Sequence, residues 1–305
     1  MIRFNDLKKS YKGNAVLKGL NLTIPDGEIF GFIGKNGSGK STTMNILCGL
    51  LPKDSGEIYV NDEAVSIGKF LSIGYLPESP VLIKHMNAYE YLDYISACCN
   101  YTGDKKSRIN ELLALVSLKD AAKRRLGGYS RGMQQRIALA AALFNNPEIV
   151  VLDEPTSALD PEGRADIMDI IKKLGEQGKT VLFSTHILAD VERVCTHVGI
   201  LSGGTIIKQG SVAQLISEHD SNTVFVNLKS AIEGIDVKIK SLPFVSSVFY
   251  HQTNLAIDLV SSAHSRDLFE FLAAEHCDVS SFNIKKVCLE EIYLKAVNDN
   301  EQKSN

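Results

Sequence analysis

Residues 34–42 combine three glycines with a lysine and a serine in the spacing G-x-x-x-x-G-K-S/T. The stretch consists of Gly34, Lys35, Asn36, Gly37, Ser38, Gly39, Lys40, Ser41 and Thr42. Glycines let successive backbone N–H groups turn toward phosphate oxygens, Lys40 adds a positive charge near the outer phosphates, and the Ser41 hydroxyl is a ligand for Mg²⁺. Largely apolar stretches at 29–33 and 44–47 flank it, which favours a strand–loop–helix unit over an ordinary glycine-rich turn. The sequence therefore predicts a nucleotide-phosphate loop.

Two neighbouring carboxylates follow a predicted buried strand. Asp153 and Glu154 come directly after the apolar run 149–152. Open parallel sheets collect their ligands where strands end, and the chain turns there, so both side chains can address the phosphate pocket. We expect Asp153 to support Mg²⁺ through Ser41 or a water molecule. Glu154 would orient or deprotonate the water that attacks a phosphate.

Three further residues allow more than one interpretation. His186 follows the end of the next predicted strand, so it should lie beside the two carboxylates, where it would either hydrogen-bond the outer phosphate or serve a structural role. Ser130 is placed to cap a helix, which makes that helix N-terminus an anion site. Tyr11 lies in an early β-like stretch and is either an aromatic that stacks on adenine or an ordinary surface residue.

Composition and charge limit the function classes. The 305 residues carry a net charge of -3, which gives no overall positive field, so no nucleic-acid partner is expected. The longest apolar run, 137–144, is far shorter than the roughly 20 residues that span a bilayer, and the N-terminus lacks a signal-peptide pattern. We therefore expect the chain to stay in the cytosol. Its six cysteines lack metal-ligand spacing and are expected to be reduced.

The pattern of predicted elements indicates two domains. Residues 1–218 alternate strands and helices around the phosphate loop, with an antiparallel β layer at the start and a helical insertion at about 85–145. A polar link at 219–222 precedes a small α+β accessory domain at 222–298. Its predicted order, β-α-β-β-α-β with a final helix, is ferredoxin-like. Residues 299–305 are polar and are expected to form a disordered tail.

The order of these motifs resembles the ATP-binding subunit of an ABC transporter over about the first two-thirds of the chain. The resemblance implies the following correspondence: residues 34–41 with the Walker A loop, 149–153 with the Walker B strand, Glu154 with the catalytic glutamate, 157–160 ending in Asp160 with the D-loop, His186 with the switch histidine, and Tyr11 with the adenine-stacking aromatic. It also implies a P-loop NTPase fold of ABC ATPase type, with antiparallel β and helical subdomains, and ATP and Mg²⁺ as cofactors.

Two segments depart from the family pattern. The family signature is usually Leu-Ser-Gly-Gly-Gln, whereas this chain keeps Ser130 and Gly132 but has Arg131 and Met133. Glu78 stands where the family usually has the Q-loop glutamine, and its carboxylate can still hold Mg²⁺ or water. Both departures, together with the C-terminal extension, are similar to the subgroup that drives ABC-2-type exporters.

The resemblance implies a transport ATPase that works as a head-to-tail dimer of two ATPase subunits, identical or different. Each ATP would lie between Walker A of one subunit and residues 130–133 of the other. The partner would be a separate integral membrane permease, which would hold the chain at the cytoplasmic face of the membrane. A soluble ABC-type ATPase acting on ribosomes or DNA is the alternative, but such proteins usually have tandem cassettes, coiled coils or basic arms. A small-molecule kinase has no use for residues 130–133 or His186.

Overall fold

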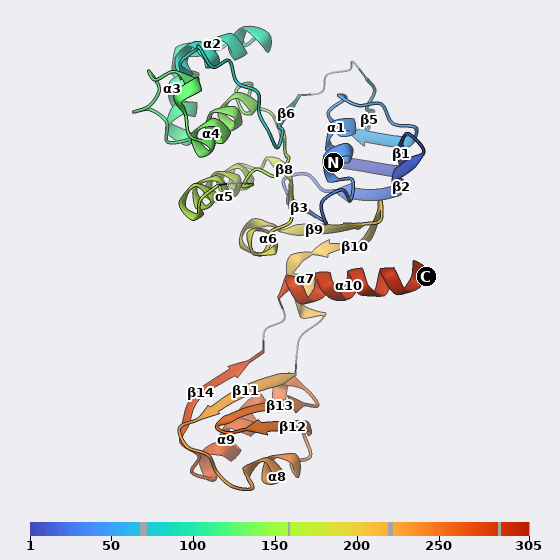
Figure 1. Cartoon of the computed structure of the whole chain (residues 1–305), viewed down its shortest axis with the longest axis vertical. Helices are drawn as coiled ribbons and strands as arrows, with labels where there is room; N and C mark the ends of the chain where they lie inside the picture. The colour runs from blue at the N-terminus through green and yellow to red at the C-terminus, as the bar shows by residue number, and fades with distance from the viewer. Residues whose placement is uncertain (68–71, 158, 219–221, 286–287, 305) are drawn as a thin grey trace. The chain divides into compact units, whose positions relative to one another are not determined.

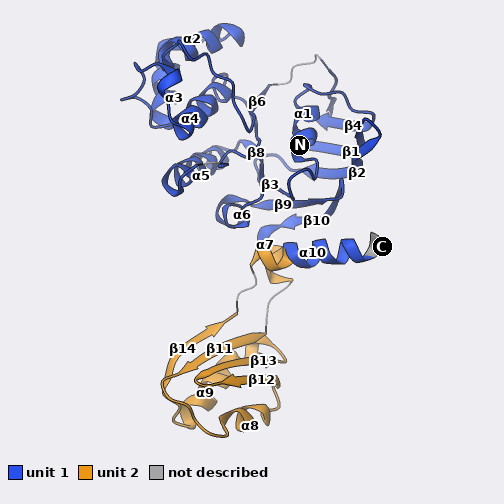
Figure 2. Cartoon of the chain, in the orientation of Figure 1, with its two compact units in different colours: residues 1–212, 293–305 blue, residues 213–292 orange. Residues whose placement is uncertain are grey.

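The computed structural model describes residues 1–67, 72–157, 159–218, 222–285 and 288–304 (Figure 1). It divides into two compact units, Met1–Val212 with Tyr293–Asn305, and Ala213–Ile292 (Figure 2). The chain therefore returns to its first unit at its C-terminal end. None of the described helices is long and apolar enough to cross a membrane.

The C-terminal end differs from the sequence expectation. Helix α10 spans Leu289–Ser304, so residues 299–304 continue a helix where a disordered tail is predicted. Residues 299–304 are polar, so their composition alone does not predict a helix. The buried apolar residues of α10, which are Leu289, Ile292 and Val297, lie nearer its N-terminal end. The unit boundaries also differ from the predicted domains 1–218 and 222–298. The second unit begins at Ala213 and ends at Ile292, and the residues from Tyr293 onward belong to the first unit.

An antiparallel sheet opens the first unit, as predicted. Its order is β2-β1-β4-β5, formed by β1 (Ile2–Tyr11), β2 (Asn14–Ile24), β4 (Ser55–Val60) and β5 (Glu63–Ala64). Alternate residues of β1 and β2 are buried, which is the pattern of a sheet with one face against the core.

The second sheet of this unit is mostly parallel and has the order β10-β9-β3-β8-β7-β6. Its strands are β3 (Ile29–Ile33), β6 (Ile73–Leu76), β7 (Ile149–Leu152), β8 (Thr180–Thr185), β9 (His197–Ser202) and β10 (Thr205–Ser211). Every residue of β3, β7 and β8 is buried, so these strands lie at the centre. Because β8 lies between β3 and β7 and all three are parallel, the segments that follow them meet at one edge.

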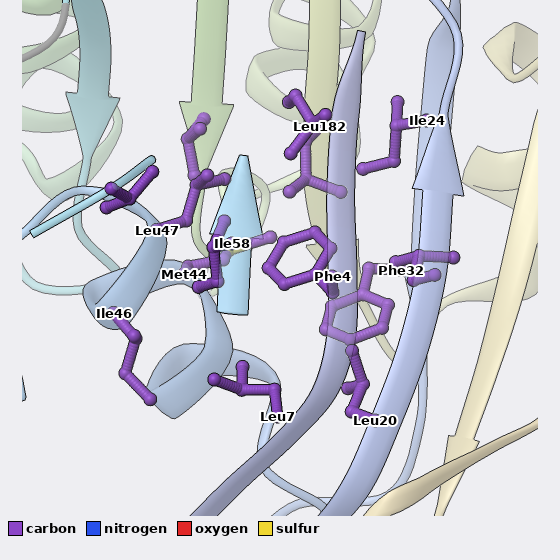
Figure 3. Close-up of a cluster of buried hydrophobic side chains, with 14 of the residues drawn as sticks. Phe4, Leu7, Leu20, Ile24, Phe32, Met44, Ile46, Leu47, Ile58 and Leu182 are labelled. Atoms are coloured by element: carbon purple, nitrogen blue, oxygen red, sulfur yellow. The ribbon is translucent and has the colours of Figure 1, made fainter. Parts of the chain in front are cut away.

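A hydrophobic core joins the two sheets to helix α1 (Lys40–Leu47) (Figure 3). Side chains from both sheets and from α1 meet there: Phe4, Leu7, Leu20, Ile24, Phe32, Met44, Ile46, Leu47, Ile58 and Leu182. Burying such side chains stabilises the fold by about 1.5–3 kcal/mol each. The core therefore anchors the helix that follows the glycine-rich loop.

Helices make up most of the stretch 85–145. They are α2 (Ala88–Cys98), α3 (Lys105–Leu115), the short η1 (Leu126–Gly128) and α4 (Arg131–Ala142). Asn87 and Glu90 form a capping box at the start of α2, and the Asp104 side chain caps α3. The first unit also contains α5 (Pro161–Glu176) and α6 (Leu188–Val194), and α7 (Val212–Ser217) lies at the boundary.

The second unit has the ferredoxin-like order that the sequence predicts. Its elements are β11 (Thr223–Leu228), α8 (Ile235–Lys240), β12 (Val245–His251), β13 (Asn254–Leu259), η2 (Ser262–His264), α9 (Ser265–Ala274) and β14 (Val279–Ile284). The sheet is antiparallel with the order β12-β13-β11-β14. A separate core, with Val226, Ile239, Ile257 and Leu268 among its buried residues, packs this unit.

Candidate active site

The glycine-rich loop connects β3 to α1, in the setting predicted from the sequence. Gly39 is the N-cap of α1 with φ +109°, and a Cβ there would lie 2.7 Å from the Leu17 side chain, so glycine is required. The Lys40 side chain is buried, and its Nζ donates to the carbonyl oxygens of Gly34 at 2.7 Å and Lys35 at 3.4 Å. The loop therefore curls around the Lys40 ammonium, whereas the Lys35 side chain is exposed and pairs with Glu301 at 3.4 Å.

Asp153 and Glu154 follow β7 and are 3% and 6% exposed. The Asp153 N–H donates to the Leu76 carbonyl at 2.8 Å, which extends the pairing of β7 with β6. Glu154 has φ +46°, a left-handed conformation that only a minority of non-glycine residues adopt. The backbone therefore turns sharply between the two carboxylates.

The Glu154 carboxylate lies between two nitrogen groups. Its Oε1 is 3.3 Å from Lys40 Nζ, and its Oε2 is 2.9 Å from His186 Nδ1. The Lys40–Glu154 pair is buried, whereas the His186 side chain is 52% exposed. Oε2 thus contacts His186, whereas Oε1 faces the Lys40 ammonium without a hydrogen bond from the described residues. His186 lies beside Glu154 as the strand order predicts.

A cavity of about 450 Å³ opens beside this cluster. It is lined by Val16, Asn36, Gly37, Gly39, Lys40, Ser41, Thr42, Glu78 and Glu154. Glu78, two residues past the end of β6, is therefore brought to the same cavity as the loop and Glu154. Val16 also lines the cavity, but its apolar side chain gave no sign in the sequence that it belongs to the site. Asp153 is not among the lining residues.

The oxygen groups at the cavity suit Mg²⁺. Proteins usually hold this ion through one or two carboxylates, with nucleotide phosphates and waters completing the octahedron. Ser41 and Glu78 offer a hydroxyl and a carboxylate on the cavity wall, and Asp153 offers a buried carboxylate next to Glu154. Within the described part of the chain, no group of three or more histidine, cysteine or acidic side chains is arranged to hold a metal alone.

Burial and the negative charge of Asp153 also act on neighbouring groups. Burial, with a smaller contribution from Asp153, raises the pKa of the Cys48 thiol to about 12. Burial likewise raises the pKa of Tyr75, and Asp153 contributes further, followed by Cys48 and Glu78. The Cys48 thiol and the Tyr75 hydroxyl are therefore neutral near pH 7.

Several residues expected at the site do not line this cavity. Tyr11 is the last residue of β1, its side chain is exposed, and Lys9 Nζ is 5.5 Å from its ring centroid. The Ser130 side chain caps α4 by accepting from the Met133 N–H at 3.3 Å, which confirms the predicted cap.

The other signature residues and the D-loop carboxylate also lie elsewhere. Arg131 is exposed, while Gly132 and Met133 are half-buried on the first turn of α4. Asp160 is exposed and caps α5 by accepting from the Gly163 N–H at 3.3 Å. Ala158 of the expected D-loop lies outside the described residues. Arg131, Gly132, Met133 and Asp160 are therefore not among the residues that line the cavity.

Two buried polar residues near the site have no counterpart in the sequence predictions. Ser184 lies within the all-buried strand β8 and hydrogen-bonds both Asp153 and Glu154. Asp190 is buried on α6, where it accepts from Thr156 Oγ1 at 3.1 Å and from Arg164 Nε at 2.8 Å. A polar residue directly after the apolar run 181–183 was the available signal for Ser184.

Comparison with known proteins identifies the family. The family model described as "ABC transporter" matches residues 17–157. The chain is 36% identical to the uncharacterized ABC transporter ATP-binding protein YxlF of Bacillus subtilis, over 97% of this chain and 99% of that protein. It is 34% identical to the linearmycin resistance ATP-binding protein LnrL of Bacillus subtilis, over 96% of this chain and 97% of LnrL.

The chain belongs to the ATP-binding proteins of ABC transporters. Its structure resembles that of the ATP-binding cassette MJ0796, a dimer in a post-hydrolysis state bound to ADP and Pi. The TM-score is 0.63 at 30% identity, covering 69% of this chain and 98% of that cassette. The predicted family, the ABC ATPase fold and the ATPase activity are thereby confirmed.

Proposed function

We propose that this ATP-binding subunit powers an exporter, in which ATP binding and hydrolysis in a head-to-tail dimer drive a separate integral membrane permease. The observation that carries the proposal is the position of Glu154, held between Lys40 and His186 on the wall of the loop cavity. Phosphoryl transfer to water needs a positioned base, a cation at the phosphates and a polar partner for the base. Glu154 and Lys40 line one cavity, and His186 contacts the Glu154 carboxylate.

Each residue of the cluster has a specific task in this proposal. The loop N–H groups and Lys40 hold the β- and γ-phosphates of ATP, and Glu154 orients and deprotonates the attacking water. His186 holds Glu154 through Nδ1, and it would hydrogen-bond the outer phosphate. Ser41, Asp153 and Glu78 would hold Mg²⁺, which neutralises the charge that develops on the phosphate oxygens.

The remaining residues are assigned to a composite site shared between two subunits. Ser130, Arg131, Gly132 and Met133 lie on the first turn of α4 and away from the cavity of their own chain. A helix N-terminus attracts phosphate, so this turn would contact the γ-phosphate bound by a second subunit, with Asp160 at the same interface. Tyr11 would stack on the adenine. The partner is a second copy or a related cassette.

The similarity to LnrL supports the exporter assignment, since that relative is a linearmycin resistance ATP-binding protein. Such a subunit would reside at the cytoplasmic face of the membrane through its permease, and it has no need of a nucleic-acid partner. Co-purification of a membrane protein with the tagged chain would test this. Hydrolysis stimulated by nucleic acid, without recovery in membranes, would instead support a soluble ABC-type ATPase.

The decisive test of the site is Glu154→Gln, which keeps the side-chain shape and removes the base. We expect hydrolysis to fall by about 10²- to 10³-fold while ATP remains bound and the dimer persists on size-exclusion chromatography. Glu176→Gln, at an exposed position at the end of α5, is the matched control and should behave as the wild type. Unchanged turnover of Glu154→Gln would remove Glu154 from the catalytic role.

A further inference from the structure

Ser184 is a fully buried polar residue beside the two carboxylates. It lies on β8, all of whose residues are buried, and its own exposure is 0%. A hydroxyl in such a position costs free energy unless it is hydrogen-bonded. Two hydrogen bonds account for its presence, and both go to the pair of residues that follows β7.

The register of the central sheet places Ser184 beside this pair. Leu152, the last residue of β7, pairs with Phe183 of β8, so Ser184 stands level with Asp153. Ser184 Oγ donates to Asp153 Oδ1 at 2.6 Å and accepts from the Glu154 N–H at 2.8 Å. A hydroxyl has one donor and two acceptor lone pairs, so both bonds form at once.

The two hydrogen bonds act on different features of the site. The bond to Asp153 Oδ1 fixes the torsion of that carboxylate and hence the direction of its second oxygen. The bond from the Glu154 N–H satisfies a buried donor in a residue whose φ is +46°. A backbone in this sparsely populated region persists only where its surroundings hold it. One hydroxyl therefore sets both the side chain of Asp153 and the backbone of Glu154.

The next residues on the strand complete the arrangement. His186 Nδ1 contacts Glu154 Oε2, while Thr185 Oγ1 accepts from the Ile187 N–H at 3.0 Å and stabilises the turn that presents His186. Ser184 and His186 thus reach Glu154 from the same strand end, one at its backbone and the other at its carboxylate.

We infer that Ser184 is a positioning residue that aligns Asp153 for Mg²⁺ and Glu154 for the attacking water. This inference rests on the proposed roles of those two carboxylates. Groups that orient a metal ligand or base through one hydrogen bond typically contribute about 10- to 100-fold to metal affinity or activity. Ser184 belongs to neither the cavity lining nor the reacting groups, so its effect should pass through Asp153 and Glu154.

The test uses the full chain and compares Ser184→Ala with Ser96→Ala. Ser96 is also fully buried, but its Oγ donates to the Asp93 carbonyl within helix α2. The affinity for a fluorescent ATP analogue is measured in Mg²⁺ and in EDTA, together with the hydrolysis rate and the Tm. We expect Ser184→Ala to weaken binding in Mg²⁺ and to slow hydrolysis by about 10- to 100-fold, with binding in EDTA unchanged.

The controls separate positioning from packing. Ser96→Ala should lower the Tm without changing the Mg²⁺-dependent gain in affinity. Ser184→Cys replaces the hydroxyl with a somewhat larger thiol that is only a weak donor, so it should reproduce the Ser184→Ala defect; it also serves as the test variant should Ser184→Ala fail to fold. Wild-type Mg²⁺ dependence and hydrolysis in the Ser184 variant would overturn the inference. So would an equal loss of affinity in Mg²⁺ and in EDTA.

The outcome is distinguishable from failure of the proposed function. Should Glu154→Gln hydrolyse ATP at the wild-type rate, the catalytic assignment fails whatever Ser184 does. Should Glu154→Gln retain ATP in a stable dimer while Ser184→Ala matches the wild type, only the positioning role is overturned.

Discussion

The Glu154 cluster and the first turn of α4 are built in opposite ways. Lys40, Glu154 and Ser184 are buried and connected to their surroundings by hydrogen bonds and ion pairs from several elements. Ser130 and Arg131 are exposed, and the Ser130 side chain accepts from the N–H of Met133, three residues ahead. The cluster is therefore assembled by the fold of one chain, whereas the α4 turn is oriented by its own helix. This difference fits the proposed site shared by two subunits.

Lys40→Ala should have the largest effect, because it disrupts the buried Glu154 cluster. It removes the charge that we propose binds the phosphates and leaves Glu154 buried without its cation. We expect ATP affinity to fall by about 10³-fold in equilibrium binding. Lys35→Ala, in the same loop but with an exposed side chain, is the matched control and should retain affinity. Tight ATP binding by Lys40→Ala would refute the assignment of the loop.

Ser130→Asn tests the proposed role of the exposed first turn of α4. Asparagine caps a helix as well as serine does, so the protein should keep its Tm, while the hydroxyl that we propose contacts the γ-phosphate is lost. We expect hydrolysis to fall by about 100-fold, with unchanged ATP binding by the separated subunit. Full hydrolysis in Ser130→Asn would mean that the α4 turn does not complete an ATP site.

Tyr11→Ala distinguishes an adenine contact from a surface aromatic. Stacking between aromatic rings contributes about 0.5–1.5 kcal/mol, so ATP affinity should fall by about 2- to 10-fold. Tyr11→Phe keeps the ring and should bind as the wild type. Tyr89→Ala, at another exposed tyrosine, controls for loss of an exposed ring. Equal affinity in Tyr11→Ala and the wild type would leave Tyr11 as a surface residue.

Glu78→Gln should produce the smallest effect, because this carboxylate lines the cavity but is exposed. Removing one exposed charge should raise the Mg²⁺ concentration for half-maximal hydrolysis by about 2- to 5-fold. A Mg²⁺ titration measures the shift, with Glu176→Gln as control. Superimposable titrations would show that the carboxylate is incidental to metal binding.

Features with local causes were predictable from the sequence. Ser130 and Asp160 cap helices through N–H groups only three residues ahead, so their neighbours in the chain carry all the information. Strand β7, which precedes Asp153, was predictable from its run of apolar residues. In the C-terminal stretch the same method failed, because α10 continues through polar residues 299–304 once its earlier apolar face is packed.

Features with distant partners were not predictable in the same way. Ser184 bonds Asp153 across 31 positions of sequence, and Thr156 bonds Asp190 across 34. Such pairs depend on which strands are neighbours and on their register, and a one-residue shift would point Ser184 to the opposite face. Val16 likewise reaches the cavity through the fold, since an ordinary strand valine has no local signal.

By itself, the sequence determined the glycine-rich loop between a strand and a helix, the two carboxylates after a buried strand and the Ser130 helix cap, because each depends on a few adjacent residues. The order of these motifs was also enough to indicate the family. Only the tertiary structure decided that β8 lies between β3 and β7 in a register that sets Ser184 beside Asp153, and that Lys40 pairs with Glu154. The physical reason is that strand order and register follow from packing across the whole sheet, which no local stretch of sequence contains.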